Sequence, residues 1–216
     1  PTDLISYVAP RIKADTSRLA ELDLSPKGFH LVVARFEVEN HVDVIVEGYV
    51  RSDAALPLVV VGSAPYADEY TARIESLADD RVRLLGGLWD QELLDALYAG
   101  ALVYYHGHSV GGTNPSLLRA IGAGAAVDAF DVSFNREVLG EAGRYWTSPD
   151  DVAALVASAE SDAGAQAARG EESRERAALY DWDEVASGYE ALARRLALEG
   201  PTRHRPSGRR TGKVSL

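Results

Sequence analysis

The sequence predicts an α/β fold, a Rossmann-like doubly wound parallel sheet of about six strands. Short apolar runs, each followed by Gly, Ser, Asn or Pro, alternate with segments whose apolar residues repeat at helical spacing. The runs are nearly continuous in branched and aromatic residues, which indicates strands that helices cover on both faces.

The expected elements follow one another in regular order along the chain. Residues 1–29 are expected to form an N-terminal segment with a short helix at 18–22, because Asp15 to Ser17 are capping residues. The expected strands are 30–36, 57–62, 81–85, 101–105, 125–130 and 144–146. The expected helices between them are 41–52, 66–79, 91–99 and 115–123.

The last third of the chain is predicted to be helical. Ser148 and Pro149 open a helix, as a capping serine followed by a proline at the first helical position. The helical pattern continues to residue 199 and is interrupted at 162–171, where two glycines lie among polar residues. Residues 200–216 are expected to form a basic, disordered tail.

Composition excludes several classes of protein. The chain of 216 residues has no cysteine, which excludes a disulfide scaffold and a thiolate metal site. The net charge is −11, although residues 201–216 hold five Arg or Lys and no acid, so we expect no nucleic-acid partner. We expect no integral membrane segment, since no apolar stretch is long enough to span a bilayer. The chain starts at Pro1 and has no methionine, so we expect a piece of a longer protein or an edited sequence.

The loop after the fourth expected strand is predicted to bind phosphate. If the strand order is 3-2-1-4-5-6, this loop meets the loop after the first strand where the order reverses, which is where such sheets bind ligands. In its sequence, HGHSVGGTNPSLLRA, Gly111 and Gly112 let backbone approach a ligand, and Thr113 or Asn114 caps the next helix. The free amides of that helix, from Pro115 onward, suit a diphosphate. The alternative interpretation is a turn followed by a well-capped helix.

The loop after the first strand, ARFEVENH, contains no glycine. The dinucleotide-binding fingerprint is therefore absent, which argues against an NAD or FAD enzyme. Arg35 is a candidate for a bidentate phosphate contact, although pairing with Glu37 or Glu39 explains it equally well. Asn40 is a candidate cap for the helix at 41.

Two histidines, His106 and His108, flank Gly107 after the fourth strand. No third ligand of suitable spacing is visible in the sequence, so we expect no metal site. The expected role of one of these histidines is a hydrogen bond to a sugar or phosphate oxygen.

Several segments carry a family resemblance, in the order LVVARFEVENHVDVIVEGY, PLVVVGSAP, VRLLGGLWDQELLDALYAG, HGHSVGGTNPSLLRA, FNREVLGEAG and YDWDEVASGYEALARR. Through them, residues 14–200 resemble the C-terminal, donor-binding half of a GT-B glycosyltransferase of the family 4 retaining group. VARFEVENH and HGHSVGGTNPSLL look most like bacterial rhamnosyltransferases of surface-polysaccharide assembly. The last segment resembles the helix that crosses back to the other domain in this family.

The resemblance implies that residues 30–199 bind a nucleotide-diphosphosugar, a UDP- or dTDP-sugar, with no cofactor and no metal. It implies that Arg35 binds phosphate, that Asn40 stands where many relatives have a phosphate-binding Lys, and that the loop 86–89 lies against the base. The loop 111–114 would cradle the diphosphate and the sugar. The implied binding residues are Arg35, Asn40, His106, His108, Gly111, Gly112, Thr113, Asn114, Ser116 and Arg119, with Gly87, Leu88 and Trp89 on the base side.

Two positions depart from the family pattern. The two glutamates that the family has around this loop, one for the donor sugar and one for the ribose, correspond here to Gly111 and Arg119. A carboxylate accepts hydrogen bonds from a ribose, whereas Arg donates, so Arg119 is expected to weaken nucleoside recognition. Arg119 is also a candidate partner for Asp128, which lies in an apolar strand pattern and needs a partner if it is buried and ionised. The alternative is a solvated Asp128 near a strand end.

The implied reaction moves rhamnose or another hexose to a glycan or lipid-linked glycan acceptor. The resemblance places the acceptor on an N-terminal domain that this chain lacks, so we expect the isolated chain to be inactive. We expect a cytoplasmic protein, peripheral at the inner membrane face. Two alternatives are a degenerate nucleotide-binding module without catalysis, favoured by the lost carboxylates, and a sugar-nucleotide epimerase of GT-B type.

Overall fold

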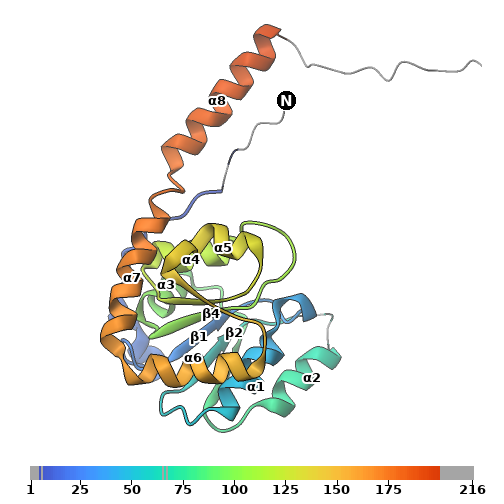
Figure 1. Ribbon diagram of the computed structural model, residues 1–216, viewed down its shortest axis with the longest axis vertical. Coiled ribbons are helices and arrows are strands. Elements are labelled where there is room, and N and C mark those ends of the chain that lie inside the picture. Colours follow the sequence, from blue (N-terminus) through green and yellow to red (C-terminus); the bar gives the residue numbers. More distant parts are fainter. Residues whose placement is uncertain (1–4, 6, 65, 67, 200–216) are drawn as a thin grey trace, which may run out of the picture.

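The computed structural model describes residues 5–199 except 6, 65 and 67. At its centre is a six-stranded sheet in the order β3-β2-β1-β4-β5-β6, in which neighbouring strands are parallel (Figure 1). The strands are β1 (His30–Val33), β2 (Leu58–Val61), β3 (Val82–Gly86), β4 (Val103–His106), β5 (Val127–Phe130) and β6 (Gly143–Trp146). The fold class and the strand order expected from the sequence are confirmed.

Helices cover both faces of the sheet, as its apolar strands require. One face is covered by α1 (Val42–Arg51), α2 (Asp68–Leu77) and α6 (Pro149–Ser161). The other face carries the 3-10 helix η1 (Thr16–Leu22), α3 (Gln91–Gly100), α4 (Pro115–Ala123), α5 (Ser133–Leu139) and α7 (Ala163–Ala177). Two 3-10 turns, η2 (Val38–Asn40) and η3 (Gly140–Ala142), lie in the loops.

Buried apolar side chains form two layers, one on each side of the sheet. In β4, Tyr104 belongs to one layer and Tyr105 to the other, and Val59 and Val60 divide in the same way in β2. This alternation is the two-residue period of a strand, and a one-residue slip would exchange the two faces. The register is therefore fixed by packing, and the loops at the strand ends start from a rigid frame.

Some helix boundaries differ from those expected. The helical pattern is interrupted within the expected range 162–171, but only at Asp162, whose side chain caps α7 by accepting from the Ala165 amide. Gly170 lies inside α7, where a Cβ would come within 2.5 Å of the Gly124 carbonyl oxygen, so it permits close packing rather than ending the helix. The expected tail, 200–216, lies outside the described residues.

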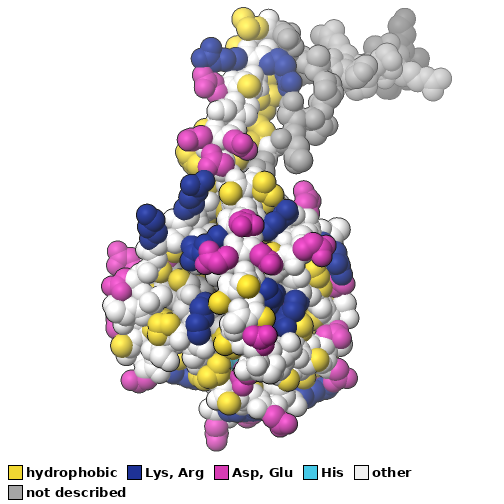
Figure 2. All heavy atoms as spheres, turned by 60° about the vertical axis from the view of Figure 1, so that its left-hand side comes forward, with side chains coloured by type: hydrophobic (Ala, Val, Ile, Leu, Met, Phe, Trp, Pro, Cys, Tyr) yellow, Lys and Arg dark blue, Asp and Glu magenta, His cyan; other side chains and the backbone are white. Residues whose placement is uncertain are grey.

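A last helix, α8 (Trp182–Glu199), extends away from the body (Figure 1). Trp182, Tyr189 and Leu196 are 67%, 59% and 44% exposed. Their spacing by seven residues places them along one face of the helix. Figure 2 shows apolar side chains along this helix beside charged ones.

Candidate functional site

A pocket opens at the carboxyl end of the sheet. Its volume is about 580 Å³, and its walls come from the loops after β1, β2, β3 and β4 and from the N-terminal turns of α3 and α4. The strand order reverses at this place, between β1 and β4, which is where the sequence predicts a ligand to bind. The volume lies in the range of small-molecule sites in proteins.

Glycines at two strand ends bring the pocket loops together. A Cβ at Gly107 would lie 2.0 Å from the carbonyl oxygen of Asn40, and a Cβ at Gly62 would lie 1.8 Å from that of Ala34. A side chain cannot be accommodated at these distances, so glycine allows the loop after β1 to contact the loops after β2 and β4 directly. The loops on either side of the switch point are therefore packed backbone to backbone.

Arg35 stands on the β1 side of the pocket. Its side chain is 78% exposed, and its Nη1 lies 3.0 Å from Glu37 Oε1. The pairing with Glu37 that the sequence left open is therefore present. An ion pair this exposed contributes about 0–1 kcal/mol, so an anionic ligand can take the place of Glu37 at little cost.

Asn40 supports the backbone of the same loop. Its side chain is buried, and its Nδ2 donates to the Arg35 carbonyl oxygen at 2.9 Å. The expectation that Asn40 caps the following helix is wrong, because Asn40 lies in η2 and the N-cap of α1 is His41. Asn40 lines the pocket, and its hydrogen bond holds the backbone of Arg35, the residue that brings positive charge to the pocket.

The N-terminal end of α4 forms the wall opposite Arg35. Asn114 caps the helix, since its Oδ1 accepts from the Ser116 amide at 2.9 Å and from the Ser116 hydroxyl at 2.8 Å. Of the two cap candidates, Asn114 is therefore confirmed. Asn114 and Ser116 both line the pocket, so the positive end of the helix dipole faces it.

The glycine pair of this loop lies outside the residues that line the pocket. Gly111 has a φ of 112°, and a Cβ at Gly111 or Gly112 would meet no described atom within 4 Å. Thr113 belongs to the same loop and is likewise not part of the lining. Contacts of these three residues with a ligand stay predictions.

The two histidines form a stacked pair under and beside the pocket. His108 lines the pocket, and its ring lies 4.4 Å from the ring of buried His106, at an interplanar angle of 9°. Burial, followed by the charge of Arg35, lowers the pKa of His108 to about 4, and burial lowers the pKa of His106 well below its usual value. Both rings are therefore neutral at pH 7. Among the described residues, His108 Nδ1 and His106 Nε2 have no hydrogen-bond partner.

A buried tyrosine connects the histidines to α4. The Tyr104 hydroxyl lies 3.1 Å from His106 Nδ1 and donates to Ser116 Oγ at 3.2 Å. A polar row thus runs from the cap of α4 to His106 beneath the pocket. Sequence reasoning missed Tyr104, because a tyrosine in an apolar strand is typical of a core residue.

The loop after β3 forms the third wall. Gly87, Leu88 and Trp89 line the pocket, and Trp89 is 94% exposed. An exposed indole at a pocket edge is suited to stack on a flat aromatic group. Ser63 also lines the pocket, and the sequence analysis did not predict it. The signal was present, because Ser63 follows a buried strand as Arg35 does.

Arg119 lies outside the pocket lining and is bound by Asp95 of α3. Its Nε and Nη2 donate to the two Asp95 oxygens at 2.6 and 2.9 Å. The expected pairing of Arg119 with Asp128 is therefore wrong. Asp128 is fully buried and accepts from Arg144 and Arg169 at 2.7 and 2.8 Å, so a solvated Asp128 is wrong as well.

The described residues show no cluster of three or more His, Cys, Asp or Glu side chains placed to hold a metal ion. Among the helices that the structure describes, none is long and apolar enough to cross a membrane. On the face drawn in Figure 2, basic and acidic side chains are interspersed over the body.

Comparison with known proteins places this geometry in context. The model of the family described as glycosyl transferases group 1 matches residues 19–176. The GtfA subunit of the UDP-N-acetylglucosamine–peptide N-acetylglucosaminyltransferase of Streptococcus gordonii is 29% identical over 118 residues. That match covers 53% of this chain and 22% of the relative.

Solved structures share the fold. Sucrose-phosphate synthase from Thermosynechococcus elongatus has a TM-score of 0.72 at 24% identity, over 91% of this chain and 53% of that one. HepE of Anabaena, solved in complex with UDP-glucose, has a TM-score of 0.72 at 14% identity, over 85% of this chain and 52% of that one. The chain therefore spans about half the length of these two structures.

Proposed function

The chain belongs to the glycosyl transferases of group 1, and from this premise we propose that its pocket binds the nucleotide-diphosphosugar donor, a UDP- or dTDP-sugar. The observation that carries the proposal is the set of three walls, in which Arg35, the start of α4 and Trp89 face one cavity at the switch point. A cation and a helix N-terminus suit the diphosphate, and an exposed indole suits the base.

In this proposal the diphosphate lies between Arg35 and α4. Cleavage of the bond between sugar and phosphate leaves negative charge on the nucleoside diphosphate, and groups placed to stabilise that charge accelerate the transfer. Arg35 supplies a positive charge, and the first amides of α4 supply the positive end of a helix dipole. Neutral His108 supplies a ring nitrogen for a sugar or phosphate oxygen. We propose that these groups make a metal ion unnecessary.

We infer that a second domain supplies the acceptor, a glycan or lipid-linked glycan, and that it docks on α8. The supporting observation is an apolar groove between α8 and the N-terminal residues, lined by Tyr7, Val185 and Tyr189 among others. Such an exposed apolar groove suits an interface with another domain. The chain by itself is then expected to bind the donor without transferring the sugar, for which rhamnose or another hexose is the candidate.

A nucleotide-binding module without catalysis is the second candidate function. The ion pair between Arg119 and Asp95 favours it, because a guanidinium stands where the sequence resemblance implies a ribose-binding carboxylate. Membership of a transferase family favours sugar transfer over this candidate and over an epimerase.

The test is Arg35→Ala, with calorimetric titration of UDP and of uridine. We expect UDP to lose about 2 kcal/mol of binding free energy, because a charge-assisted contact to phosphate disappears, while uridine loses less. The matched control is Arg73→Ala, which removes another exposed arginine, the partner of Asp43. Equal losses for both ligands, or unfolding of the Arg35 variant, would show that Arg35 is structural and that the phosphate site is misassigned.

A further inference from the structure

We propose that Arg18, which lies before the first strand and outside the pocket, is a positioning residue for the base-side wall. It acts through Asp90 and α3 on the loop that carries Trp89. The inference rests on the proposed function, since it assigns to the N-terminal segment the task of holding the wall against which the nucleoside lies.

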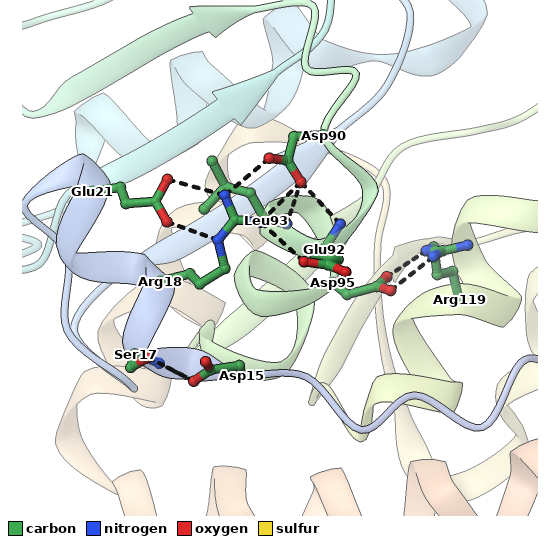
Figure 3. A network of polar contacts seen from close by, with 9 residues as sticks. All are labelled: Asp15, Ser17, Arg18, Glu21, Asp90, Glu92, Leu93, Asp95 and Arg119. Carbon is green, nitrogen blue, oxygen red and sulfur yellow. Dashed lines mark hydrogen bonds and ion pairs between the residues drawn. The ribbon is translucent and has the colours of Figure 1, made fainter.

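Arg18 reaches from η1 to the start of α3 (Figure 3). Its Nη1 and Nη2 donate to the two carboxylate oxygens of Asp90 at 3.0 and 2.9 Å, although 72 residues separate the two in the chain. Its Nε and Nη2 also donate to the two oxygens of Glu21 at 2.7 and 3.0 Å. Glu21, on the same 3-10 helix, thus orients the guanidinium so that its other edge faces Asp90.

Asp90 joins this contact to the pocket. Its Oδ1 accepts from the amides of Glu92 and Leu93 at 3.1 and 3.0 Å, so the same carboxylate caps α3 (Figure 3). The hydrogen bonds from Arg18, and then that from the Leu93 amide, lower the pKa of Asp90 to about 2 and keep it ionised. Asp90 follows Trp89 directly, and Leu94 in the next turn lines the same pocket. A displacement of Asp90 therefore displaces the wall.

The N-terminal segment also holds the far end of α3. Leu19 is fully buried against Gly100, where a Cβ would lie 2.4 Å from Leu19 Cδ1. Lys27 Nζ donates to the carbonyl oxygens of Ala99 and Ala101 at 3.2 and 2.9 Å. Residues that precede β1 therefore contact α3 at both ends, and these contacts fix the position of its first turn beside the pocket.

Another arginine offers a matched control. Arg51 donates to Glu47 and to Asp150, and so joins α1 to α6 through two acidic partners, as Arg18 joins η1 to α3. Arg51 does not belong to the pocket lining. Loss of either arginine is expected to lower the melting temperature by a similar small amount, whereas loss of Arg18 alone is expected to loosen Trp89.

The experiment compares Arg18→Gln with Arg51→Gln on the full chain, by titration with UDP, uridine and inorganic diphosphate. We expect Arg18→Gln to weaken UDP and uridine binding by a common factor of about five, as supporting contacts to a binding wall do, and to leave diphosphate binding unchanged. Asp90→Ser keeps a capping oxygen but loses the ion pair with Arg18, which leaves the 3.6 Å pair of Arg18 Nη1 with Glu92 Oε2 as the ion pair from η1 to α3. It should therefore reproduce most of the effect, and the double variant should add little. Arg18→Lys, which keeps the charge, should restore part of the affinity.

Fluorescence anisotropy of Trp89 supplies a second readout that general stability does not change; it is measured in a Trp182→Phe background, and the signal of the third tryptophan, buried Trp146, is subtracted with a Trp89→Phe variant in the same background. Arg18→Gln should lower it and Arg51→Gln should not. If the unmodified chain binds UDP, and Arg18→Gln binds uridine with the same affinity as the unmodified chain does, the positioning role is overturned while the proposed function stands. If the unmodified chain binds neither UDP nor uridine, the proposed function itself fails and the positioning role fails with it.

Discussion

The two ends of the sheet hold similar polar side chains in opposite conditions. Near the amino end, two buried side chains have charged partners inside the protein: His30 Nε2 lies 3.0 Å from Glu160 Oε1, and Asp128 is held between two arginines. At the carboxyl end, Arg35 and His108 face an open pocket, and the ion pair of Arg35 with Glu37 is exposed to solvent. The difference separates the polar groups that stabilise the fold from those that are available to a ligand. A buried polar group that is paired inside the protein has little hydrogen-bonding capacity left for a ligand.

One pair at the carboxyl end behaves like those at the amino end. Arg119 and Asp95 bind each other through two hydrogen bonds, with 26% and 20% of their side chains exposed. They join α3 to α4 just behind the pocket, since Leu94 and Ser116 on the same helices line it. Opening this pair therefore tests whether a paired polar group beside the pocket can be made available to a ligand.

The largest effect is expected at the amino end, from Asp128→Ala. Removing the carboxylate leaves Arg144 and Arg169 without their buried partner, which should cost about 3–5 kcal/mol of unfolding free energy. Urea denaturation measures it, and UDP affinity of the folded protein should not change. The control, Asp131→Ala, removes an exposed pair with Arg136 and should cost about 0–1 kcal/mol. A decrease of less than about 1 kcal/mol in the unfolding free energy for Asp128→Ala would contradict the conclusion that the buried pairs near the amino end stabilise the fold.

A smaller effect is expected when the exceptional pair is opened. In Arg119→Glu with Asp95→Asn, a carboxylate that no arginine holds should accept a ribose hydroxyl and tighten UDP binding by about 1.5–3 kcal/mol. The second substitution is needed because a glutamate introduced beside Asp95 would bring two like charges together. Calorimetry with UDP and with its 2′,3′-dideoxy analogue decides the matter, since an equal gain for both ligands would mean that the ribose is not read here.

The smallest effect concerns His108 and pH. Because its pKa in the folded protein is lowered to about 4 from 6.5, the unfolded chain binds a proton between these values that the folded chain does not. Stability should therefore fall as pH decreases through this window. His108→Asn should reduce the loss between about pH 6.5 and 5.5 by about 1 kcal/mol, as measured by urea denaturation. The two proteins should show the same trend above about pH 8, and an unchanged slope in the acidic window would mean that His108 is solvated.

Much of the fold is predictable from local patterns. The six runs correspond to the six strands. The inner strands β2, β1, β4 and β5 are buried on both faces and need an almost unbroken apolar run, whereas the edge strands β3 and β6 are only partly buried and tolerate an arginine. α5 was missed because Ser133–Leu139 has only seven residues, too few to display a helical period. Gly170 misled the prediction of a break, because its role depends on the Gly124 carbonyl in another element, which a local pattern does not contain.

The candidate site was predictable where its residues follow strands. Arg35, His108 and Asn114 were singled out because the carboxyl ends of parallel strands meet at one edge, and the structure places them around one pocket. The partners of charged groups were not predictable. Arg119 lies one helix before Asp128 in the sequence, yet it pairs with Asp95 on a neighbouring helix.

The contacts of the N-terminal segment with α3 determine where this domain begins when it is transferred between proteins. A boundary drawn at the first strand would keep the whole sheet and every residue that lines the pocket. It would leave behind Arg18, Leu19 and Lys27, which hold the two ends of α3. A transfer of this domain between proteins, by recombination or by design, must therefore carry the chain from Asp15 onward if the recipient is to acquire the wall as well as the sheet.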